Sequence, residues 1–313
     1  MSHFIIDCDP GHDDALAILM AARHLDLVGV TTVFGNSTVE NTTRNALAIL
    51  SAAGLSHIPV AMGAGGPLTG ETRSAETVHG KTGLDGANFP PSSLKPVPTP
   101  AAEFIAAQAE RHGDLTVIAI APETNIATTL QQFPEAAKRI VGISVMGGST
   151  TFGNATAAAE FNIFADPEAA YRVFESGIPI TMVGLNVTTT FGVTREHITR
   201  LTGGGKLVAR ELGTALQYYL DRQTALYQRP YAPVHDVCAV LPFSHPGLMH
   251  HRSMHVAIEC DGKYTRGMTV CDQRGIIAGD GIVAAQSPNA RVATQADGSA
   301  ITNLLLDTLL EFP

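Results

Sequence analysis

Apolar runs and helical patterns alternate along most of the chain. The apolar, partly β-branched runs predict strands, and the stretches between them carry apolar residues at helical spacing. Strands are predicted at residues 4–8, 28–33, 58–61, 115–120, 140–146 and 180–183. Helices are predicted at residues 13–23, 40–53, 101–111, 125–132 and 166–175. This alternation predicts an α/β fold with an open, mostly parallel, Rossmann-like sheet and helices on both faces.

The remaining segments are less regular. Residues 63–100 are rich in Gly, Pro, Ser and Thr and predict a long loop, and loops of that length are often functional. Residues 194–250 predict a largely helical region, and the tail predicts strands at 254–259 and 268–270 and a helix at 301–310. No repeat and no linker divides the sequence, so we expect a single domain over residues 1–313.

Composition narrows the classes of partner. The 20 Lys and Arg against 29 Asp and Glu give a formal net charge of −9, which disfavours nucleic acid and anionic membrane surfaces as partners. No apolar run reaches the roughly 20 residues of a membrane helix, and no basic segment of the secretion-signal type opens the sequence. The four cysteines form no CxxC pair. These features lead us to expect a reduced, cytoplasmic protein.

Polar residues follow the ends of five predicted strands. Ligands of open α/β sheets bind outside the carboxyl ends of the strands, so these groups predict one shared pocket. The groups are Asp7 to Asp14, Asn36, Glu123 to Asn125, Asn154 with Glu160 and Asn162, and Asn186.

The densest group is the sequence Asp-Cys-Asp-Pro-Gly-His-Asp-Asp at residues 7–14. Asp13 and Asp14 fall in the first turn of a predicted helix, where their ordinary role is to complement the helix dipole. Four carboxylates within eight residues nevertheless repel one another unless a cation lies among them. Because all these ligands are oxygens, a hard ion such as Ca²⁺ or Mg²⁺ is favoured.

Other candidate residues carry weaker signals. His235 and Asp236 precede a helical segment, where Asp236 can equally be an ordinary N-cap residue. His79 lies in the long loop, and a loop histidine is more often a surface residue than a catalytic one. Tyr218 and Tyr219 predict helix packing, with substrate stacking as the less common role. The sequence has no GxGxxG after the first strand, no GxxxxGK[ST] and no GxSxG, so it predicts no dinucleotide, P-loop or serine-nucleophile site.

Taken together, these motifs resemble those of the inosine-uridine-preferring nucleoside hydrolases. Seven blocks match that family in its order, at residues 7–15, 31–36, 123–127, 145–148, 153–156, 160–170 and 234–236. The resemblance implies a nucleoside hydrolase fold and a Ca²⁺-dependent enzyme. Its reaction would be hydrolysis of the N-glycosidic bond of ribonucleosides to free base and ribose.

The resemblance also implies roles for individual residues. Ca²⁺ would be bound by the carboxylates of Asp9, Asp14 and Asp236 and by the backbone carbonyl of Thr124. The ribose hydroxyls would be held by Asp13, Asn36, Asn154, Glu160, Asn162 and Asp236. Asp9 would activate a metal-bound water, His235 would protonate the leaving base, and His79 would contact the base. Glu123 stands where family members often have Leu, which leaves the surroundings of Thr124 open.

Two other functions stay open at this point. An Asp-x-Asp motif after a first strand also suits a metal-dependent phosphohydrolase, although the expected Lys and Ser/Thr phosphate clamps are missing from the later strand ends. A non-catalytic nucleoside-binding protein could use the same polar pocket. The preference for purine or pyrimidine bases is not readable from these residues. The resemblance further implies a homo-oligomer, either a dimer or a tetramer.

Overall fold

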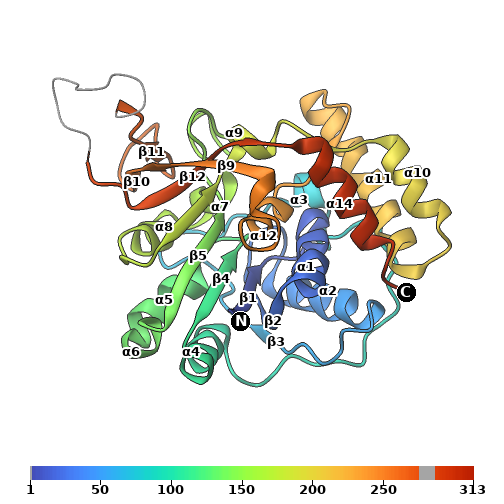
Figure 1. The fold of residues 1–313 in the computed structure, drawn as a ribbon, viewed down its shortest axis with the longest axis horizontal. Coiled ribbons are helices and arrows are strands. Elements are labelled where there is room, and N and C mark those ends of the chain that lie inside the picture. Colours follow the sequence, from blue (N-terminus) through green and yellow to red (C-terminus); the bar gives the residue numbers. More distant parts are fainter. Residues whose placement is uncertain (1, 275–285) are drawn as a thin grey trace.

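The computed structural model describes residues 2–274 and 286–313. Its largest feature is an eight-stranded sheet with the strand order β3-β2-β1-β4-β5-β6-β12-β9, drawn in Figure 1. The strands are β1 (His3–Cys8), β2 (Asp26–Thr32), β3 (Val60–Met62), β4 (Leu115–Ala119), β5 (Ile140–Met146), β6 (Ile180–Val183), β12 (Ala290–Ala296) and β9 (Met249–Met254). All neighbours pair in parallel except β12 and β9, which pair antiparallel. The predicted mostly parallel sheet is confirmed.

Helices cover both faces of this sheet (Figure 1). One core lies between the sheet and α1 (His12–His24), α2 (Val39–Ala52), α10 (Arg195–Gly203), α11 (Leu207–Tyr227), α12 (Val237–Ser244) and α14 (Gly298–Leu309). A second core lies between the sheet and α4 (Ala101–His112), α5 (Thr124–Gln132), α6 (Pro134–Ala137) and α8 (Pro167–Phe174). No helix among the described residues is long and apolar enough to cross a bilayer.

Short elements complete the described chain. They are α3 (Glu76–His79), α7 (Phe161–Ala165), α9 (Leu185–Thr188), the 3-10 turn η1 (Pro246–Leu248), and two small antiparallel sheets, β7 (Gly192–Val193) with β8 (Ala232–Pro233) and β10 (Val256–Ile258) with β11 (Thr269–Cys271). The predicted long loop at 63–100 is mostly irregular and contains α3 as its one named helix.

The composition of β1 explains why the sheet is buried on both sides. Alternate side chains of a strand point to opposite faces. Phe4, Ile6 and Cys8 enter the core under α1 and α12, and Ile5 enters the core under α4 and α5. A strand that is apolar on both faces is typical of a central parallel strand.

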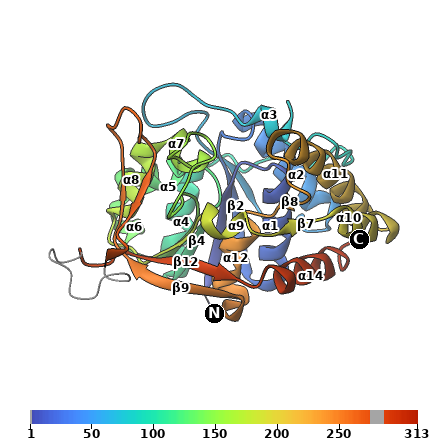
Figure 2. The ribbon, with the colours of Figure 1, turned by 90° about the horizontal axis from the view of Figure 1, so that it is seen from above.

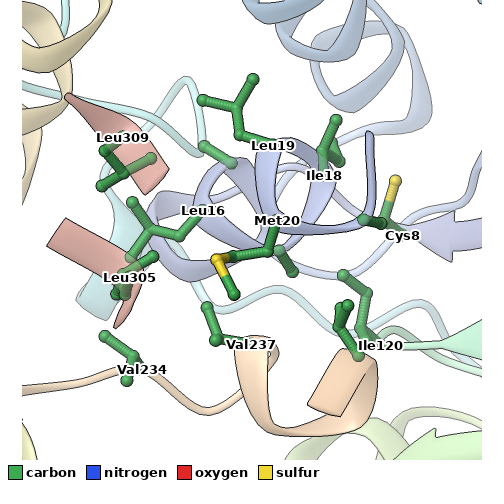
Figure 3. Packing of buried hydrophobic residues seen from close by; sticks show 14 of the residues in the cluster. Cys8, Leu16, Ile18, Leu19, Met20, Ile120, Val234, Val237, Leu305 and Leu309 are labelled. Atoms are coloured by element: carbon green, nitrogen blue, oxygen red, sulfur yellow. The ribbon is translucent and has the colours of Figure 1, made fainter. Parts of the chain in front are cut away.

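The helix α1 lies at the centre of the larger core. Its residues 15–21 are all fully buried, so this helix is apolar all round instead of amphipathic. Figure 3 shows Leu16 and Met20 of α1 beside Leu305 of α14 and Val237 of α12. Two helices from the C-terminal part of the chain therefore hold the N-terminal helix α1 in place against the sheet.

The strand order fixes the position of a binding crevice. The chain moves outward from β1 through β2 to β3 and then returns to β4 on the other side of β1. Such a switch point opens a crevice at the carboxyl ends of the two diverging strands. Figure 2 shows α3 and α7 at one end of the molecule and the N-terminus at the opposite end. The carboxyl ends of β1 and its parallel neighbours point toward the end that carries α3 and α7.

Two features of the tail differ from the sequence prediction. The predicted strand at 254–259 is wrong as a single element, because β9 ends at Met254 in the large sheet and β10 belongs to a small one. The strand β12 was not predicted at all, although it joins the large sheet between β6 and β9. Its sequence, Ala-Arg-Val-Ala-Thr-Gln-Ala, mixes small and polar residues and has only one large apolar side chain.

The prediction of one domain stays a prediction, and we propose it for residues 1–313. Strands from β1 near the N-terminus to β12 near the C-terminus pair within one sheet. The larger core likewise combines buried residues from α1 with buried residues from α14.

The contact between α14 and α1 can be tested by truncating Leu305. The side chain is fully buried, so Leu305→Ala should lower the free energy of unfolding by about 2–5 kcal/mol. Urea unfolding followed by circular dichroism measures this change. Leu226→Ala removes the same atoms from a side chain that is 48% exposed, and it should change stability by less than about 0.5 kcal/mol. Equal midpoints for the two variants would contradict this packing.

Candidate active site

A cavity of about 360 Å³ opens at the carboxyl ends of β1, β4 and β5. Ile120 and Met146, at the ends of β4 and β5, form part of its wall. Most of the predicted site residues line this cavity, namely Asp9, Asp13, Asn36, His79, Asn154, Glu160, Asn162, His235 and Asp236. The structure thus brings together side chains that lie more than two hundred residues apart in sequence.

Carboxylates gather at one side of the cavity. Asp13, Asp14 and Asp236 each offer an oxygen, and these three atoms lie within 4.8 Å of one another. Asp13 and Asp14 occupy the first turn of α1, and Asp236 directly precedes α12. Asp236 makes no side-chain hydrogen bond to the helix that it precedes, so its carboxylate does not serve as an ordinary N-cap. All three residues are buried, which makes this cluster a candidate cation site.

Asp14 itself lies behind the cavity wall and is held by three donors. Its carboxylate accepts hydrogen bonds from the backbone N–H of Asp9 at 3.1 Å, the backbone N–H of Gly11 at 2.9 Å and Nδ2 of Asn36 at 2.9 Å. These bonds fold the turn after β1 back onto the start of α1. They orient Asp14 without neutralising its charge.

Asp9 is held from the end of β2. Its Oδ2 accepts a hydrogen bond from the backbone N–H of Asn36 at 2.6 Å. Gly35 has a φ of +151°, and a Cβ on it would lie 2.0 Å from Asp9 Oδ2. Only glycine therefore allows the segment that follows β2 to approach this carboxylate so closely.

Burial makes this group of acids difficult to ionise. Burial and then the neighbouring Asp14 raise the pKa of Asp13 to about 8. Burial raises the pKa of Asp9 and of Asp236 well above the usual range, with further contributions from the other carboxylates of the cluster. No Lys or Arg in the described ranges forms an ion pair with these acids. A cation among them would supply the missing positive charge.

Amides and one glutamate form the neighbouring wall. The Glu160 carboxylate accepts hydrogen bonds from the backbone N–H groups of Gly148, Asn162 and Ile163 at 3.0, 2.9 and 3.2 Å. Burial nevertheless raises the pKa of Glu160 to about 7. Asn162 Nδ2 donates to the carbonyl of Ile120 at 3.2 Å. It also donates to the Met146 carbonyl at 3.0 Å, which leaves its Oδ1 for a ligand.

Asn154 lies at the exposed rim of the same wall. Its Oδ1 accepts a hydrogen bond from the backbone N–H of Phe161 at 2.9 Å. This bond ties the loop that follows β5 to the start of α7, the helix that carries Asn162. Asn154 itself is part of the cavity wall.

Two histidines, His235 and His79, also line the cavity. Nδ1 of His235 lies 2.7 Å from Oγ1 of Thr188 in α9. Loss of solvation, followed by the charge of Arg229, lowers the pKa of His235 to about 3. His79 packs its ring against Tyr219 at a centroid distance of 5.4 Å. Burial likewise lowers the pKa of His79 well below its usual range, so both imidazoles are neutral at physiological pH.

Thr124 is the one predicted metal ligand that neither lines the cavity nor belongs to the cluster of Asp13, Asp14 and Asp236. Its hydroxyl donates to Asp166 Oδ2 at 2.6 Å, and its carbonyl accepts from Thr128 Oγ1 at 2.7 Å. It is not part of the cavity wall. Ile120, at the end of β4, presents its carbonyl to Asn162 within the cavity instead.

Asp7 and Glu123 lie behind the cavity, under α5. Asp7 Oδ1 accepts hydrogen bonds from Thr31 Oγ1 at 2.6 Å and Asn125 Nδ2 at 2.8 Å. Both oxygens of Glu123 are buried without a hydrogen-bond partner. Burial, followed by the charges of Glu160 and Asp166, raises the pKa of Glu123 to about 8. At neutral pH Glu123 is therefore an uncharged acid.

The sequence suggested that the loop at 63–100 and the segment at 218–235 line the pocket for the base, and it named Tyr219 as a less common stacking candidate. It did not single out Arg73 of the loop, nor Gln223, Tyr227 and Arg229 of α11 and the segment that follows it, although all of them line the cavity. Tyr219, Gln223 and Tyr227 are spaced four residues apart, and residues at that spacing lie on one face of a helix. The sequence could therefore have shown that these three side chains share a face of α11. No comparable pattern pointed to Arg73.

The family model described as inosine-uridine preferring nucleoside hydrolase matches residues 4–303. The pyrimidine-specific ribonucleoside hydrolase RihA of Enterobacter sp. (strain 638) is 38% identical over 312 residues, covering 98% of this chain and 97% of RihA. A plant nucleoside hydrolase, PpNRh1, is 32% identical with a TM-score of 0.90 over 99% of both chains. A purine-preferring ribonucleoside hydrolase from Gardnerella vaginalis is 29% identical with a TM-score of 0.90, covering 99% of this chain and 98% of the other.

The chain belongs to the inosine-uridine preferring nucleoside hydrolase family. It is an enzyme, a nucleoside N-ribohydrolase that cleaves the N-glycosidic bond of ribonucleosides with water. The family resemblance of the sequence motifs is thereby confirmed. The phosphohydrolase and the non-catalytic binding protein lose their support.

The uncharged state of Glu123 predicts a pH-dependent stability. The folded protein keeps the Glu123 proton up to about pH 8, whereas the unfolded chain releases it near the ordinary value of 4.5. This group therefore makes the fold less stable as pH rises from 5 to 8. Glu123→Gln cannot lose a proton, so its stability relative to the wild type should improve by on the order of 2–4 kcal/mol over that range.

Urea unfolding at pH 5, 6, 7 and 8 measures the difference between the two proteins. Glu135→Gln, at an exposed carboxylate of α6, controls for the loss of one negative charge. Parallel pH profiles for wild type and Glu123→Gln would show that Glu123 is ionised in the folded state.

Proposed function

We propose that the cavity binds a ribonucleoside with its ribose against the acids and its base toward the two histidines. The observation that carries this proposal is the convergence of Asp9, Asp13 and Asp236 on one cavity wall. Vicinal ribose hydroxyls can donate hydrogen bonds to carboxylates and can also coordinate a cation. The neutral, aromatic-lined part of the cavity suits a planar uncharged base.

We further propose Ca²⁺ as the cation of the acidic cluster. Ca²⁺ takes six to eight oxygen ligands in flexible geometries, and every candidate ligand in the cluster is an oxygen. Asp9, Asp14 and Asp236 would hold the ion by their carboxylates. We replace Thr124 in this set by the backbone carbonyl of Ile120, because only the latter lines the cavity. When bound, such an ion lowers the pKa of a neighbouring water and polarises ribose hydroxyls.

Asp9 is our candidate for the general base. Its Oδ2 is fixed by the Asn36 backbone N–H, and its carboxylate lines the cavity. A carboxylate in this position can take a proton from the attacking water. As the bond to the base stretches, positive charge grows on the ribose ring, and the surrounding carboxylates stabilise that charge. Glu160 and the Asn162 Oδ1 would hold the sugar hydroxyls during this change.

His235 is our candidate donor to the leaving base. A neutral imidazole carries one proton, and the Thr188 hydroxyl can donate to its Nδ1. The proton then lies on Nε2, on the side of the ring away from Thr188. In this arrangement His235 donates a hydrogen bond as a neutral group and not as an imidazolium.

The base preference that we propose is for pyrimidine ribonucleosides. The support is the 38% identity to relatives named pyrimidine-specific, against 29% for the solved structure named purine-preferring. The dimer or tetramer and the cytoplasmic location stay predictions from the sequence.

Replacing Asp9 tests the general base. Asp9→Asn keeps the size of the side chain and removes the proton acceptor, so kcat should fall by about 10²–10⁴-fold with a smaller effect on KM. Chromatography of free base and ribose from uridine, cytidine, inosine, adenosine and guanosine measures both the rates and the preference. Asp26→Asn, at a half-exposed position on β2, serves as the matched control. Near-normal turnover by Asp9→Asn would remove Asp9 from this role.

Removal of the metal tests the cation. Chelation should abolish activity, and added Ca²⁺ should restore it, because the buried acids repel one another without the ion. Ca²⁺ should also raise the unfolding temperature in proportion to the logarithm of its concentration above Kd. Asp14→Asn should weaken that shift, whereas Asp26→Asn should leave it intact. Full activity in a preparation verified as metal-free would rule the cation out.

A further inference from the structure

His12 is the member of the Asp-Cys-Asp-Pro-Gly-His-Asp-Asp motif that the proposed function leaves without a role. It is the first residue of α1 and is 1% exposed. It does not line the cavity. It lies directly behind His79, which does line the cavity, and both rings pack against Tyr219.

Both ring nitrogens of His12 have defined partners. Nε2 lies 2.9 Å from the backbone carbonyl oxygen of Asp85. Nδ1 lies 3.1 Å from Nδ1 of His79. The ring is stacked on Tyr219 at an interplanar angle of 8°, so it cannot rotate without losing this contact.

These partners determine where the protons lie. A carbonyl oxygen can only accept, so His12 Nε2 carries a proton. A neutral imidazole has one such proton, which leaves His12 Nδ1 bare and able to accept. His79 Nδ1 must then donate to it, and His79 Nε2 is the bare nitrogen. His79 Nε2 has no hydrogen-bond partner among the described residues, although the ring lines the cavity.

One contact competes with this assignment. The backbone N–H of His12 lies 3.4 Å from His79 Nδ1 and would need that nitrogen to accept. A His12 imidazolium would carry a proton on Nδ1 and would likewise make His79 Nδ1 the acceptor. The ring-to-ring contact is shorter, and no carboxylate oxygen is within hydrogen-bond distance of the His12 ring in the described part of the chain. The shorter contact therefore favours the neutral chain of bonds from His79 Nδ1 through His12 to the Asp85 carbonyl.

The turn that carries the Asp85 carbonyl is itself held in place. The Asp85 carboxylate accepts hydrogen bonds from the backbone N–H groups of Lys81 and Thr82 at 3.2 and 3.1 Å. Gly80 has a φ of +80°, and a Cβ there would lie 2.2 Å from the Asp85 carboxyl carbon. On the other side, a Cβ on Gly11 would lie 2.6 Å from His79 Nδ1. The local backbone therefore fits closely around the two rings.

We propose that His12 is a positioning residue that fixes the tautomer of His79, so that His79 Nε2 accepts a hydrogen bond from the bound nucleoside. This inference rests on the proposed function. It adds that, in one contact with the nucleoside, the protein accepts the hydrogen bond and the ligand donates it. The ligand chemistry is an N–H or O–H donor. Two groups of a nucleoside could supply it, the ring N–H of an oxo-base such as uracil and the 5′-hydroxyl of the ribose.

The tautomer can be observed without any assay of activity. In protein labelled with ¹⁵N-histidine, long-range ¹H–¹⁵N correlation spectra distinguish protonated from bare ring nitrogens. His79→Gln identifies the His79 signals by their loss. We expect a protonated Nδ1 and a bare Nε2 for His79 in the wild type. A protonated Nε2 on His79 overturns the proposal.

Two variants of similar size separate hydrogen bonding from packing. His12→Asn retains an oxygen near the position of Nδ1 that can accept from His79, whereas His12→Leu offers none. The Asn variant should keep the wild-type His79 spectrum. The Leu variant should shift His79 toward the Nε2–H form. Identical His79 spectra in all three proteins would overturn the role of His12 even if the tautomer itself were as expected.

Kinetics with donor-deleted substrates identify the group that His79 contacts. His12→Leu should raise KM for uridine about tenfold, the value of one hydrogen bond, with a smaller change in kcat and with rescue in His12→Asn. If the base N–H is the donor, His12→Leu should not raise the KM for 3-methyluridine, which lacks that N–H. If the sugar hydroxyl is the donor, the variant should not raise the KM for 5′-deoxyuridine. An equal loss with both analogues and uridine overturns the proposal. If no nucleoside is cleaved by the wild type, the proposed function fails while the spectra still decide the tautomer.

Discussion

Mutual repulsion between buried carboxylates is the constraint on which this molecule depends. Asp9, Asp13, Asp14 and Asp236 are all nearly inaccessible to solvent, and each pKa is raised by burial. Burying several like charges without compensation costs more than a fold of ordinary stability can supply. Either the acids bind protons or a cation lies among them. The all-oxygen donor set and the adjoining cavity favour a bound cation over protonation of the acids.

The surrounding fold serves to hold these acids together against their repulsion. Asp14 is oriented by backbone N–H groups of the turn after β1, and Asp9 is oriented by the backbone at the end of β2. Asp236 reaches the cluster because α12 packs against α1 and the sheet. The switch in strand order beside β1 creates the space into which these groups converge. Apolar packing of α1 thus supplies the free energy that keeps the acids in place.

The sequence predicted the central strands because burial on both faces leaves a continuous apolar signal, as in β1 and β4. It missed β12, which lies between β6 and the edge strand β9, because a strand of small and polar residues carries little of that signal. The acids and amides of the site were predictable as side chains with recognisable chemistry. A backbone carbonyl has no such signature, and for that reason the sequence named Thr124 where the structure presents Ile120 to the cavity. His12 was visible in the motif, but its contact with His79 depends on the conformation of a long loop.

The cavity wall carries both carboxylates and a guanidinium, and these groups suit the two charges that develop when the bond to the base breaks. Cleavage of the N-glycosidic bond leaves positive charge on the ribose and carries negative charge to the departing base. Asp9, Asp13 and Asp236 line the cavity together with Arg229, which is close enough to His235 to lower the pKa of that histidine. Both cavity histidines are neutral, so together with Arg229 they offer hydrogen bonds and a guanidinium in place of an acidic imidazolium. A base that spreads its own negative charge over its carbonyl oxygens, as uracil does, fits such an environment better than one that must be fully protonated before it leaves.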